Sequence, residues 1–286
     1  MQETYLNIAI PSNILEDCNN LRSKTQKLGQ IARAAAIFRV QKIIIYSIDK
    51  TTMENYSQDI KLIKGILEYL DCPQYLRKSL IPKLPMFKYV GTLPPLRTPH
   101  HPLEKEFGEI ARNSIREGFV LFSNQYYSNI EIGLEKPLKI KIPNLPKNTR
   151  IILKLKKQQN ILSGVPIKKE NIKEYWGFDV EIFEESLKLF RKKFSNYIIV
   201  ATSKRGIPIK QINNGLVKKF GERNKIIILF GSPNKGLFEI FENNGINLAE
   251  WVDLVINSIP KQGTHTIRVE EAIFSTLAVL NYILTQ

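Results

Sequence analysis

The 286-residue sequence contains few residues of the kinds that build metal centres and disulfide frameworks, namely two cysteines (Cys18 and Cys72) and three histidines. Two cysteines allow at most one disulfide, and their separation matches no usual spacing of metal ligands. A zinc site built from cysteine and histidine is therefore not expected, and we predict a protein without a metal.

Long hydrophobic runs are also missing. No apolar run reaches the roughly 18 to 20 residues that a bilayer span requires. The opening segment, MQETYLNIAIP, lacks the basic region and long apolar stretch of a signal peptide. A content of 43% hydrophobic and 24% charged residues is typical of a globular protein. We therefore expect a cytoplasmic protein with no membrane contact.

Acidic residues are scarce relative to basic ones. The sequence has 42 lysines and arginines against 27 acidic residues, which gives a net charge of +15 and a pI near 9.6. A polyanionic partner is the natural interpretation, and nucleic acid is the commonest intracellular polyanion. The alternative is a lysine-rich composition that serves solubility and surface ion pairs, as in heat-adapted proteins.

Both ends of the chain show the pattern of an α/β domain with a parallel sheet, because buried-type apolar strands alternate with amphipathic helices. The expected strands are 6–10, 42–48, 197–203, 225–232 and 254–256. The expected helices are 14–40, 58–70, 180–194, 209–221, 236–245 and one that closes the chain.

The middle of the chain has another pattern. Residues 81–103 are crowded with proline and cannot be a helix interior. Short runs with period-two alternation follow at 118–122, 130–134, 138–142 and 150–156, which predicts a small antiparallel barrel or sandwich. The segment from Lys139 to Glu170 contains nine basic residues and one acidic residue. We expect an α/β domain at 1–85 and 168–286, interrupted by a basic β-module at 86–167.

Three loops rich in Gly, Ser, Thr and Asn follow strands in the second half of the chain: ATSKRG after Val200, FGSPNKG after Leu229 and NSIPKQGTHT after Ile256. Ligands bind at the carboxyl ends of strands in open α/β sheets, so the loops could form one pocket. No loop matches the phosphate-binding pattern GxxxxGK[ST], which disfavours a nucleoside triphosphate. Each loop taken alone could also be an ordinary turn.

Several segments resemble one family. ILFGSPNKGL and INSIPKQGTHTIRVEEAIFSTLAVLN resemble the knotted, S-adenosylmethionine-dependent RNA methyltransferases of the SPOUT superfamily. The segments RSKTQKLGQIARAAAIFRVQKIIIY, YLRKSLIP, GTLPPLRTPHH and REGFV are similar to its archaeal and eukaryotic branch, which carries an inserted OB-like β-barrel. The resemblance runs in one order over almost the whole chain.

The resemblance implies a trefoil-knotted parallel α/β fold, a cofactor pocket in its C-terminal part and a homodimer formed through the same region. The closing helix, with Ile273, Leu277 and Leu280 at i, i+4 and i+7, would then supply part of the dimer interface as well as of the core. Carried over by position, the cofactor-binding residues would be Thr202, Ser203, Phe230, Gly231, Ser232, Ile256, Ile259, Pro260, Gln262, Gly263 and Thr264.

Methyl transfer needs a positioned acceptor and a group that manages its proton. We predict catalytic roles for Arg22, Arg268 and Glu270. Arg22 could equally be a solvated helix arginine, and a carboxylate in the first turn of a helix is favourable without catalysis. The predicted RNA-binding residues are Arg33, Arg150, Lys154 and Lys156, while Tyr126 and Tyr127 could stack on bases. The alternative for the lysines is an ordinary solvated surface.

The sequence therefore favours an S-adenosylmethionine-dependent RNA methyltransferase, acting on ribosomal RNA at a base nitrogen such as uridine N3 or at a ribose 2′-oxygen. A non-catalytic RNA-binding factor for ribosome assembly, with the same barrel and dimer, is the alternative. A metabolic enzyme with an acidic small substrate is a third possibility.

Overall fold

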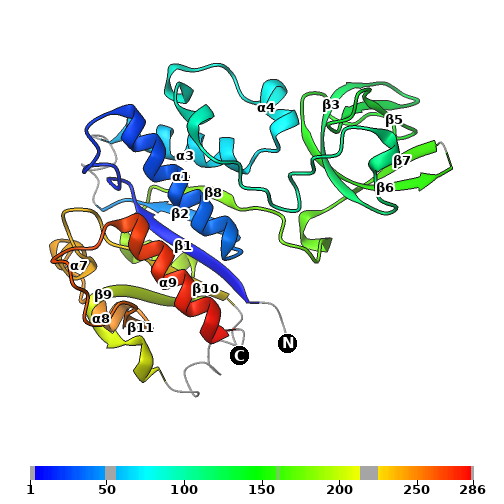
Figure 1. Ribbon diagram of the computed structural model, residues 1–286. Helices are drawn as coiled ribbons and strands as arrows, with labels where there is room; N and C mark the ends of the chain where they lie inside the picture. Colours follow the sequence, from blue (N-terminus) through cyan, green and yellow to red (C-terminus); the bar gives the residue numbers. More distant parts are fainter. Residues whose placement is uncertain (1–3, 49–55, 160, 213–224, 285–286) are drawn as a thin grey trace. The chain divides into compact units, whose positions relative to one another are not determined.

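The computed structural model describes residues 4–48, 56–159, 161–212 and 225–284. The chain divides into two compact units (Figure 1). The α/β unit comprises Met1–Glu68, Met86–Pro94 and Phe178–Gln286, and the barrel unit comprises Tyr69–Pro85 and Pro95–Gly177. Each unit is described by itself.

A six-stranded sheet forms the centre of the α/β unit, in the order β11-β9-β10-β1-β2-β8. All neighbouring strands are parallel. The apolar runs predicted as strands are buried on both faces, as expected for a parallel sheet covered by helices. The strands are β1 (Tyr5–Pro11), β2 (Lys42–Tyr46), β8 (Asp179–Phe183), β9 (Ile198–Pro208), β10 (Lys225–Leu229) and β11 (Leu254–Asn257).

Helices cover the sheet. The helices α1 (Leu21–Ile37) and α9 (Val269–Leu284) pack side by side, and the rings of Phe38 and Phe274 meet edge to face at 5.4 Å (Figure 1). One apolar cluster joins the sheet to α5 (Leu187–Lys193), α7 (Leu237–Asn243) and α8 (Leu248–Trp251). The helix α3 (Ser57–Asp71) follows β2 in the chain.

The first helix is shorter than its predicted range of 14–40. It begins at Leu21 because Asn20 caps it: the Asn20 Oδ1 accepts a hydrogen bond from the Ser23 amide at 2.9 Å, and the Asn20 amide donates to Ser23 Oγ at 3.4 Å. Ile14 and Leu15 are buried in the turn that precedes the helix. Their apolar character reflects this burial and not a helical face.

The prediction of a helix over 180–194 is wrong in its first part. The structure places β8 at Asp179–Phe183, where it pairs with β2, and α5 begins only at Leu187. Glu181 accepts hydrogen bonds from Lys42 and Lys193, each at 2.6 Å, which supports the strand at the edge of the sheet. Of the helix predicted at 209–221, the structure describes a 3-10 turn at Ile209–Gln211; residues 213–221 lie outside the described residues.

The barrel unit contains a five-stranded antiparallel sheet in the order β5-β4-β3-β6-β7. A Cβ added at Gly164 of β7 would lie 3.4 Å from Leu138 Cδ2 of β5, so the two outer strands approach each other and nearly close the barrel. This confirms the predicted antiparallel barrel. The strands are β3 (Ile115–Ser123), β4 (Ser128–Glu131), β5 (Leu138–Ile140), β6 (Arg150–Gln158) and β7 (Ile161–Ile167), and only β7 was not anticipated.

A buried polar cluster surrounds Asp71, the last residue of α3, in the barrel unit. The Nε2 atoms of His100 and His101 each lie 2.8 Å from the Asp71 carbonyl oxygen, and both rings are buried. Burial lowers the pKa of His101 to about 4, so its ring is neutral at physiological pH and donates Nε2–H to the carbonyl. Gly177 completes the cluster with a φ of +71°, a left-handed conformation that favours glycine.

We predict that Gly177→Ala strongly destabilises the protein. The added Cβ would lie 2.1 Å from Asp71 Oδ1 and 2.5 Å from His100 Cε1, in addition to the backbone strain. Overpacking and strain of this kind cost about 1–3 kcal/mol each. Urea unfolding followed by circular dichroism measures the change. Gly108→Ala, where an added Cβ meets nothing within 4 Å, is the matched control and should be close to neutral. Equal stability of the two variants would contradict this account.

Candidate functional site

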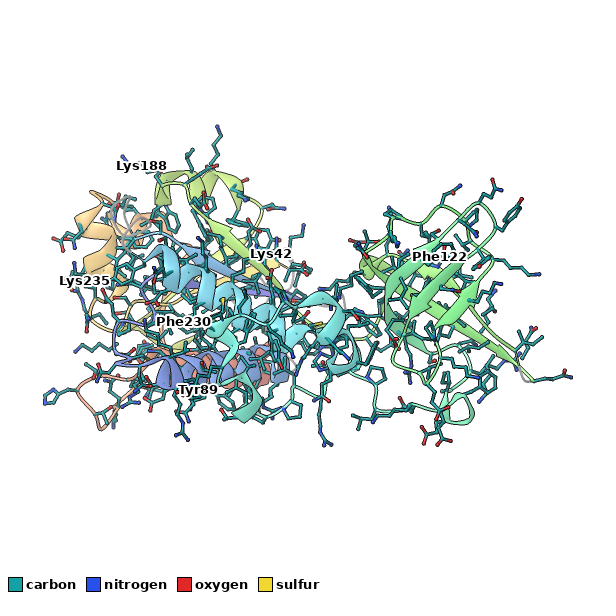
Figure 2. All side chains as sticks on the ribbon, turned by 90° about the horizontal axis from the view of Figure 1, so that it is seen from above. Lys42, Tyr89, Phe122, Lys188, Phe230 and Lys235 are labelled. Carbon is teal, nitrogen blue, oxygen red and sulfur yellow. The ribbon has the colours of Figure 1, made fainter. Side chains whose placement is uncertain are left out.

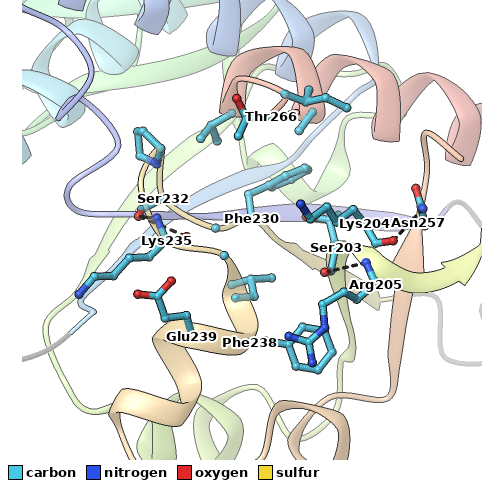
Figure 3. A pocket seen from close by; sticks show the side chains of 18 of the residues that line it. Ser203, Lys204, Arg205, Phe230, Ser232, Lys235, Phe238, Glu239, Asn257 and Thr266 are labelled. Atoms are coloured by element: carbon cyan, nitrogen blue, oxygen red, sulfur yellow. Dashed lines mark hydrogen bonds between the residues drawn. The ribbon is translucent and has the colours of Figure 1, made fainter. Parts of the chain in front are cut away.

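Three segments at the carboxyl edge of the parallel sheet enclose a cleft with a volume of about 390 Å³ (Figure 3). The first is residues 202–205 of β9, and the other two are the loops that follow β10 and β11; the neighbouring strands β11-β9-β10 place the three side by side. The volume lies within the range of small-molecule sites, roughly 300–1,000 Å³. The three segments that the sequence singled out therefore converge on one cleft, but the first, predicted as a loop after Val200, belongs to β9, where its pairing with β11 shifts from Ala201 to Ile207.

The wall formed by β9 itself is fixed by two close contacts with the neighbouring strands. Thr202 Oγ1 donates a hydrogen bond to the Leu229 carbonyl at 2.9 Å, which ties β9 to β10. A Cβ added at Gly206 would lie 2.5 Å from the Ile256 carbonyl carbon. Only glycine allows β9 and β11 to come this close, because any side chain there would meet backbone atoms.

The wall after β10 begins at Phe230, which is only 1% exposed. Its amide donates to the Ala9 carbonyl at 3.0 Å, and its carbonyl accepts from Tyr46 Oη at 2.7 Å. Ser232 and Lys235 then close a tight turn, in which the Ser232 amide donates to the Lys235 carbonyl at 2.9 Å. These bonds hold the loop before the chain enters α7.

The wall after β11 is organised by Asn257 and Gln262. Asn257 Oδ1 accepts from the Ile259 amide at 3.0 Å, and its Nδ2 donates to the Lys204 carbonyl at 3.0 Å, which joins the first loop to the third. Gln262 Nε2 donates to the carbonyls of Thr264 and His265. Side-chain amides thus fix the backbone of a loop that lacks regular structure.

The structure brings most of the expected cofactor residues together. Ile256 is fully buried beneath the cleft, whereas Pro260, Gly263 and Thr264 are exposed and do not line it. The expected residues that line the cleft are Thr202, Ser203, Phe230, Gly231, Ser232, Ile259 and Gln262.

Further residues line the cleft that the sequence did not single out. Most of them belong to the same three loops, so the loops themselves were the available signal. Val269 and Ala272 belong to α9. Their spacing of three residues, which places them on one face of a helix, was a weaker signal in the sequence. Figure 3 shows Ser203, Arg205 and Phe238 near one another, with the Arg205 guanidinium 4.2 Å from the Phe238 ring centroid. These further residues are Lys204, Arg205, Pro233, Asn234, Lys235, Gly236, Leu237, Phe238, Glu239, Asn257, Ser258, His265, Thr266, Ile267, Val269 and Ala272.

The predicted catalytic residues lie outside this lining. Arg22 is exposed in the first turn of α1. Arg268 is exposed at the start of α9, where its amide donates to Glu271 Oε2 at 2.9 Å. Glu270 is buried beside the cleft residue Val269. Their catalytic roles stay predictions.

Glu270 takes part in an ionic cluster with buried Lys27 and with Asp17, which is exposed. The Lys27 side chain is 3% exposed, and its Nζ lies 2.6 Å from Asp17 Oδ1 and 3.2 Å from Glu270 Oε2. These three residues come from the turn after β1, from α1 and from the first turn of α9. The cluster therefore anchors the segment that follows the third loop.

The predicted RNA-binding residues are distributed over both units. Arg33 is half-buried in α1, while Lys154 and Lys156 are exposed on β6. Arg150 forms a short hydrogen bond with Glu117 and an ion pair with Asp71 at 3.5 Å. Burial by itself would lower the pKa of Arg150, but the Glu117 and Asp71 carboxylates outweigh that effect and raise it. Its charge is thus already engaged within the barrel unit.

Comparison with known proteins identifies the family. A family model described as "Putative RNA methyltransferase" matches residues 5–280. The chain belongs to this family. Membership confirms the expected class, that of the SPOUT-type RNA methyltransferases, for which S-adenosylmethionine is the expected methyl donor.

Individual relatives match over nearly the whole chain. The human 28S rRNA (uridine-N(3))-methyltransferase is 30% identical and covers 96% of this chain, which spans 77% of the human protein. The Drosophila melanogaster protein of the same name is also 30% identical over 96% of this chain, which spans 61% of that relative. An uncharacterized protein of Haloarcula marismortui is 25% identical, with 96% of this chain and 97% of that protein covered.

Two further features concern the described part of the chain only. None of its helices has the length and apolar character needed to cross a membrane. Within the same residues, His, Cys, Asp and Glu side chains nowhere form a group of three or more that could hold a metal ion.

We predict that Lys27→Met destabilises the protein by about 3 kcal/mol, because the buried Glu270 carboxylate then remains without its cation. Glu270→Gln should lower the free energy of unfolding by less, because Lys27 keeps its ion pair with Asp17. Urea unfolding measures both changes. The exposed cleft residue Glu239 provides the control, and Glu239→Gln should change the free energy of unfolding by less than about 0.5 kcal/mol. A Lys27→Met variant as stable as the control would contradict the anchoring role.

Proposed function

We propose that this protein transfers a methyl group from S-adenosylmethionine to N3 of a uridine in large-subunit ribosomal RNA. The supporting observation is the match, over 96% of the chain, to two relatives named 28S rRNA (uridine-N(3))-methyltransferase. The basic composition, with a net charge of +15, fits an RNA substrate.

We propose that the cleft between the three loops holds the methyl donor. When bound, S-adenosylmethionine supplies an electrophilic methyl group on a sulfonium sulfur. The lining combines apolar side chains such as Phe230, Leu237 and Ile259, which suit an adenosine, with hydroxyl, amide and backbone groups for its polar edges. The residues proposed to hold it are those of the expected set that line the cleft, Thr202, Ser203, Phe230, Gly231, Ser232, Ile259 and Gln262. The cofactor roles of Ile256, Pro260, Gly263 and Thr264 stay predictions from the sequence.

The acceptor nitrogen sets the remaining chemical requirement. Uridine N3 carries a proton that must leave as the bond from nitrogen to carbon forms, so the site needs a base or a cation that stabilises the deprotonated ring. Arg22, Arg268 and Glu270 remain the proposed groups. For Glu270, the ion pair with Lys27 also supports a positioning role at the start of α9.

We propose that the barrel unit contributes RNA binding through Lys154, Lys156 and Arg150, with Arg33 on α1. The proposed domains are 1–85 with 168–286 for methyl transfer and 86–167 for RNA. The strand order β5-β4-β3-β6-β7, with β5 near β7, supports an OB-like barrel.

A homodimer formed through α9 and a trefoil knot at the cofactor loops also belong to this proposal. Phe274 on α9 is 44% exposed, and Tyr282 is 67% exposed, which gives the helix an apolar outer face suited to a second copy. A cytoplasmic location remains a prediction.

Gly236→Trp tests the cofactor site. Gly236 lines the cleft, and a Cβ added there meets nothing within 4 Å, so a side chain can begin at this position without a clash at its Cβ. We expect calorimetry to show a loss of S-adenosylmethionine affinity of at least tenfold. The control is Gly91→Trp, whose added Cβ also meets nothing within 4 Å and which lies outside the cleft lining. The control should bind like the parent protein. Failure of the parent protein to bind S-adenosylmethionine would overturn the enzymatic function and favour a non-catalytic RNA-binding factor.

A further inference from the structure

One end of the barrel unit carries an aromatic cluster that its core does not require. Phe122 is 40% exposed, Tyr126 is 71% exposed, and the rings of Phe122 and Tyr127 lie 5.9 Å apart. Figure 2 shows Phe122 on the barrel strands. We call Phe122, Tyr126 and Tyr127, with the turn at 123–128 that joins β3 to β4, the aromatic tip.

A β-bulge brings Phe122 to the surface. Val120, two residues earlier on β3, is fully buried in the barrel core, so regular alternation would place Phe122 on the same inner face. The register between β3 and β4 shifts between Val120 and Phe122, and Phe122 then pairs with Asn129. Bulges of this kind redirect a side chain, and they occur preferentially near functional sites.

Hydrogen bonds hold the turn in one conformation. Asn124 Oδ1 accepts from the amides of Tyr126 at 2.9 Å and Tyr127 at 3.0 Å. Ser123 Oγ accepts from the Leu145 amide at 2.9 Å, and the Asn124 carbonyl accepts from the Asn144 amide at 3.0 Å. The loop that follows β5 thus holds the aromatic tip through hydrogen bonds. Ligand binding would therefore cost little further conformational entropy in the turn.

One lysine contacts a ring of the tip, and two more follow it in the chain. Lys139 Nζ lies 3.8 Å from the Tyr127 ring centroid, and Lys139 on β5 is followed by exposed Lys141 and Lys147. Among the ion pairs of the residues that the structure describes, none involves these three lysines. Their charges are available to an anionic partner.

We propose that the aromatic tip is a stacking site for unpaired bases of an RNA strand, with Lys139, Lys141 and Lys147 contacting the adjacent phosphates. The exposed rings of Phe122 and Tyr126, with lysines that take part in no described ion pair, match the alternation of bases and phosphates in a single strand. In duplex RNA the base faces are stacked inside the helix and cannot reach such rings. A protein partner, the other occupant of an aromatic surface, would leave the lysines without a matching charge.

This proposal rests on the proposed function and deepens it. N3 of uridine lies on the edge that pairs with adenine, so methylation requires an unpaired uridine. A site that selects unpaired bases favours such a strand over a duplex. The tip would therefore contribute to the choice of substrate without taking part in methyl transfer.

The test is fluorescence anisotropy with a labelled twelve-nucleotide oligouridine, measured from low to moderate salt, with the same strand in a duplex as comparison. We expect Tyr126→Ala and Phe122→Ala each to weaken single-strand binding by roughly tenfold with little change in the salt slope. Tyr126→Phe keeps the ring and should bind like the parent protein. Lys139→Gln should instead reduce the slope of log affinity against log salt by about 0.7, one phosphate contact on a single strand.

The outcomes separate this proposal from the proposed function. Parent-like affinity of both alanine variants, an equal loss for Tyr126→Phe, or equal affinity for duplex and single strand would overturn the stacking site. Thermal unfolding of the exposed Tyr126→Ala variant should match that of the parent protein. A protein that binds the oligonucleotide through the tip but neither binds S-adenosylmethionine nor transfers a methyl group would refute the proposed function and leave the stacking site standing.

Discussion

The parallel direction of all six strands in the α/β unit is the constraint on which the candidate site depends. Strands that run the same way end at the same edge, so the loops after β10 and β11 leave the sheet beside residues 202–205 of β9. Gly206 lets β9 and β11 approach closely, because a Cβ added there would lie 2.5 Å from the Ile256 carbonyl carbon. A side chain at that position would separate β9 from β11 and widen the cleft.

Contacts from the first part of the chain support the loops from below. Tyr46 at the end of β2 donates to the Phe230 carbonyl, Ala9 of β1 accepts from the Phe230 amide, and Lys27 of α1 pairs with Glu270. These contacts join residues more than 180 positions apart. The site is thus a property of the whole α/β unit, although its lining comes from the last third of the chain.

Much of this arrangement could be predicted from the sequence, because apolar runs followed by Gly- and Ser-rich loops are local signals. The strand β8 could not be predicted from the sequence. The apolar residues of this segment recur at helical spacing, namely Val180, Phe183, Leu187, Phe190 and Phe194. Only pairing with β2 shows that the part with Val180 and Phe183 is an extended strand. The ion-pair partners of Lys27 could not be predicted from the sequence either, because Glu270 comes close to Lys27 only when α9 packs against α1. Gly263 and Thr264 were assigned to the cofactor by position, yet both are exposed and lie outside the lining of the cleft.

The two units divide the work that the account assigns to the protein: the α/β unit provides the cleft for the methyl donor, and the barrel unit offers its exposed aromatic and basic side chains to RNA. The most direct test of the central claim is mass spectrometry of nucleosides from purified ribosomal RNA, taken from cells with and without this gene. The account predicts that 3-methyluridine falls in the large-subunit RNA when the gene is removed and returns when it is restored. An unchanged level of 3-methyluridine would contradict it.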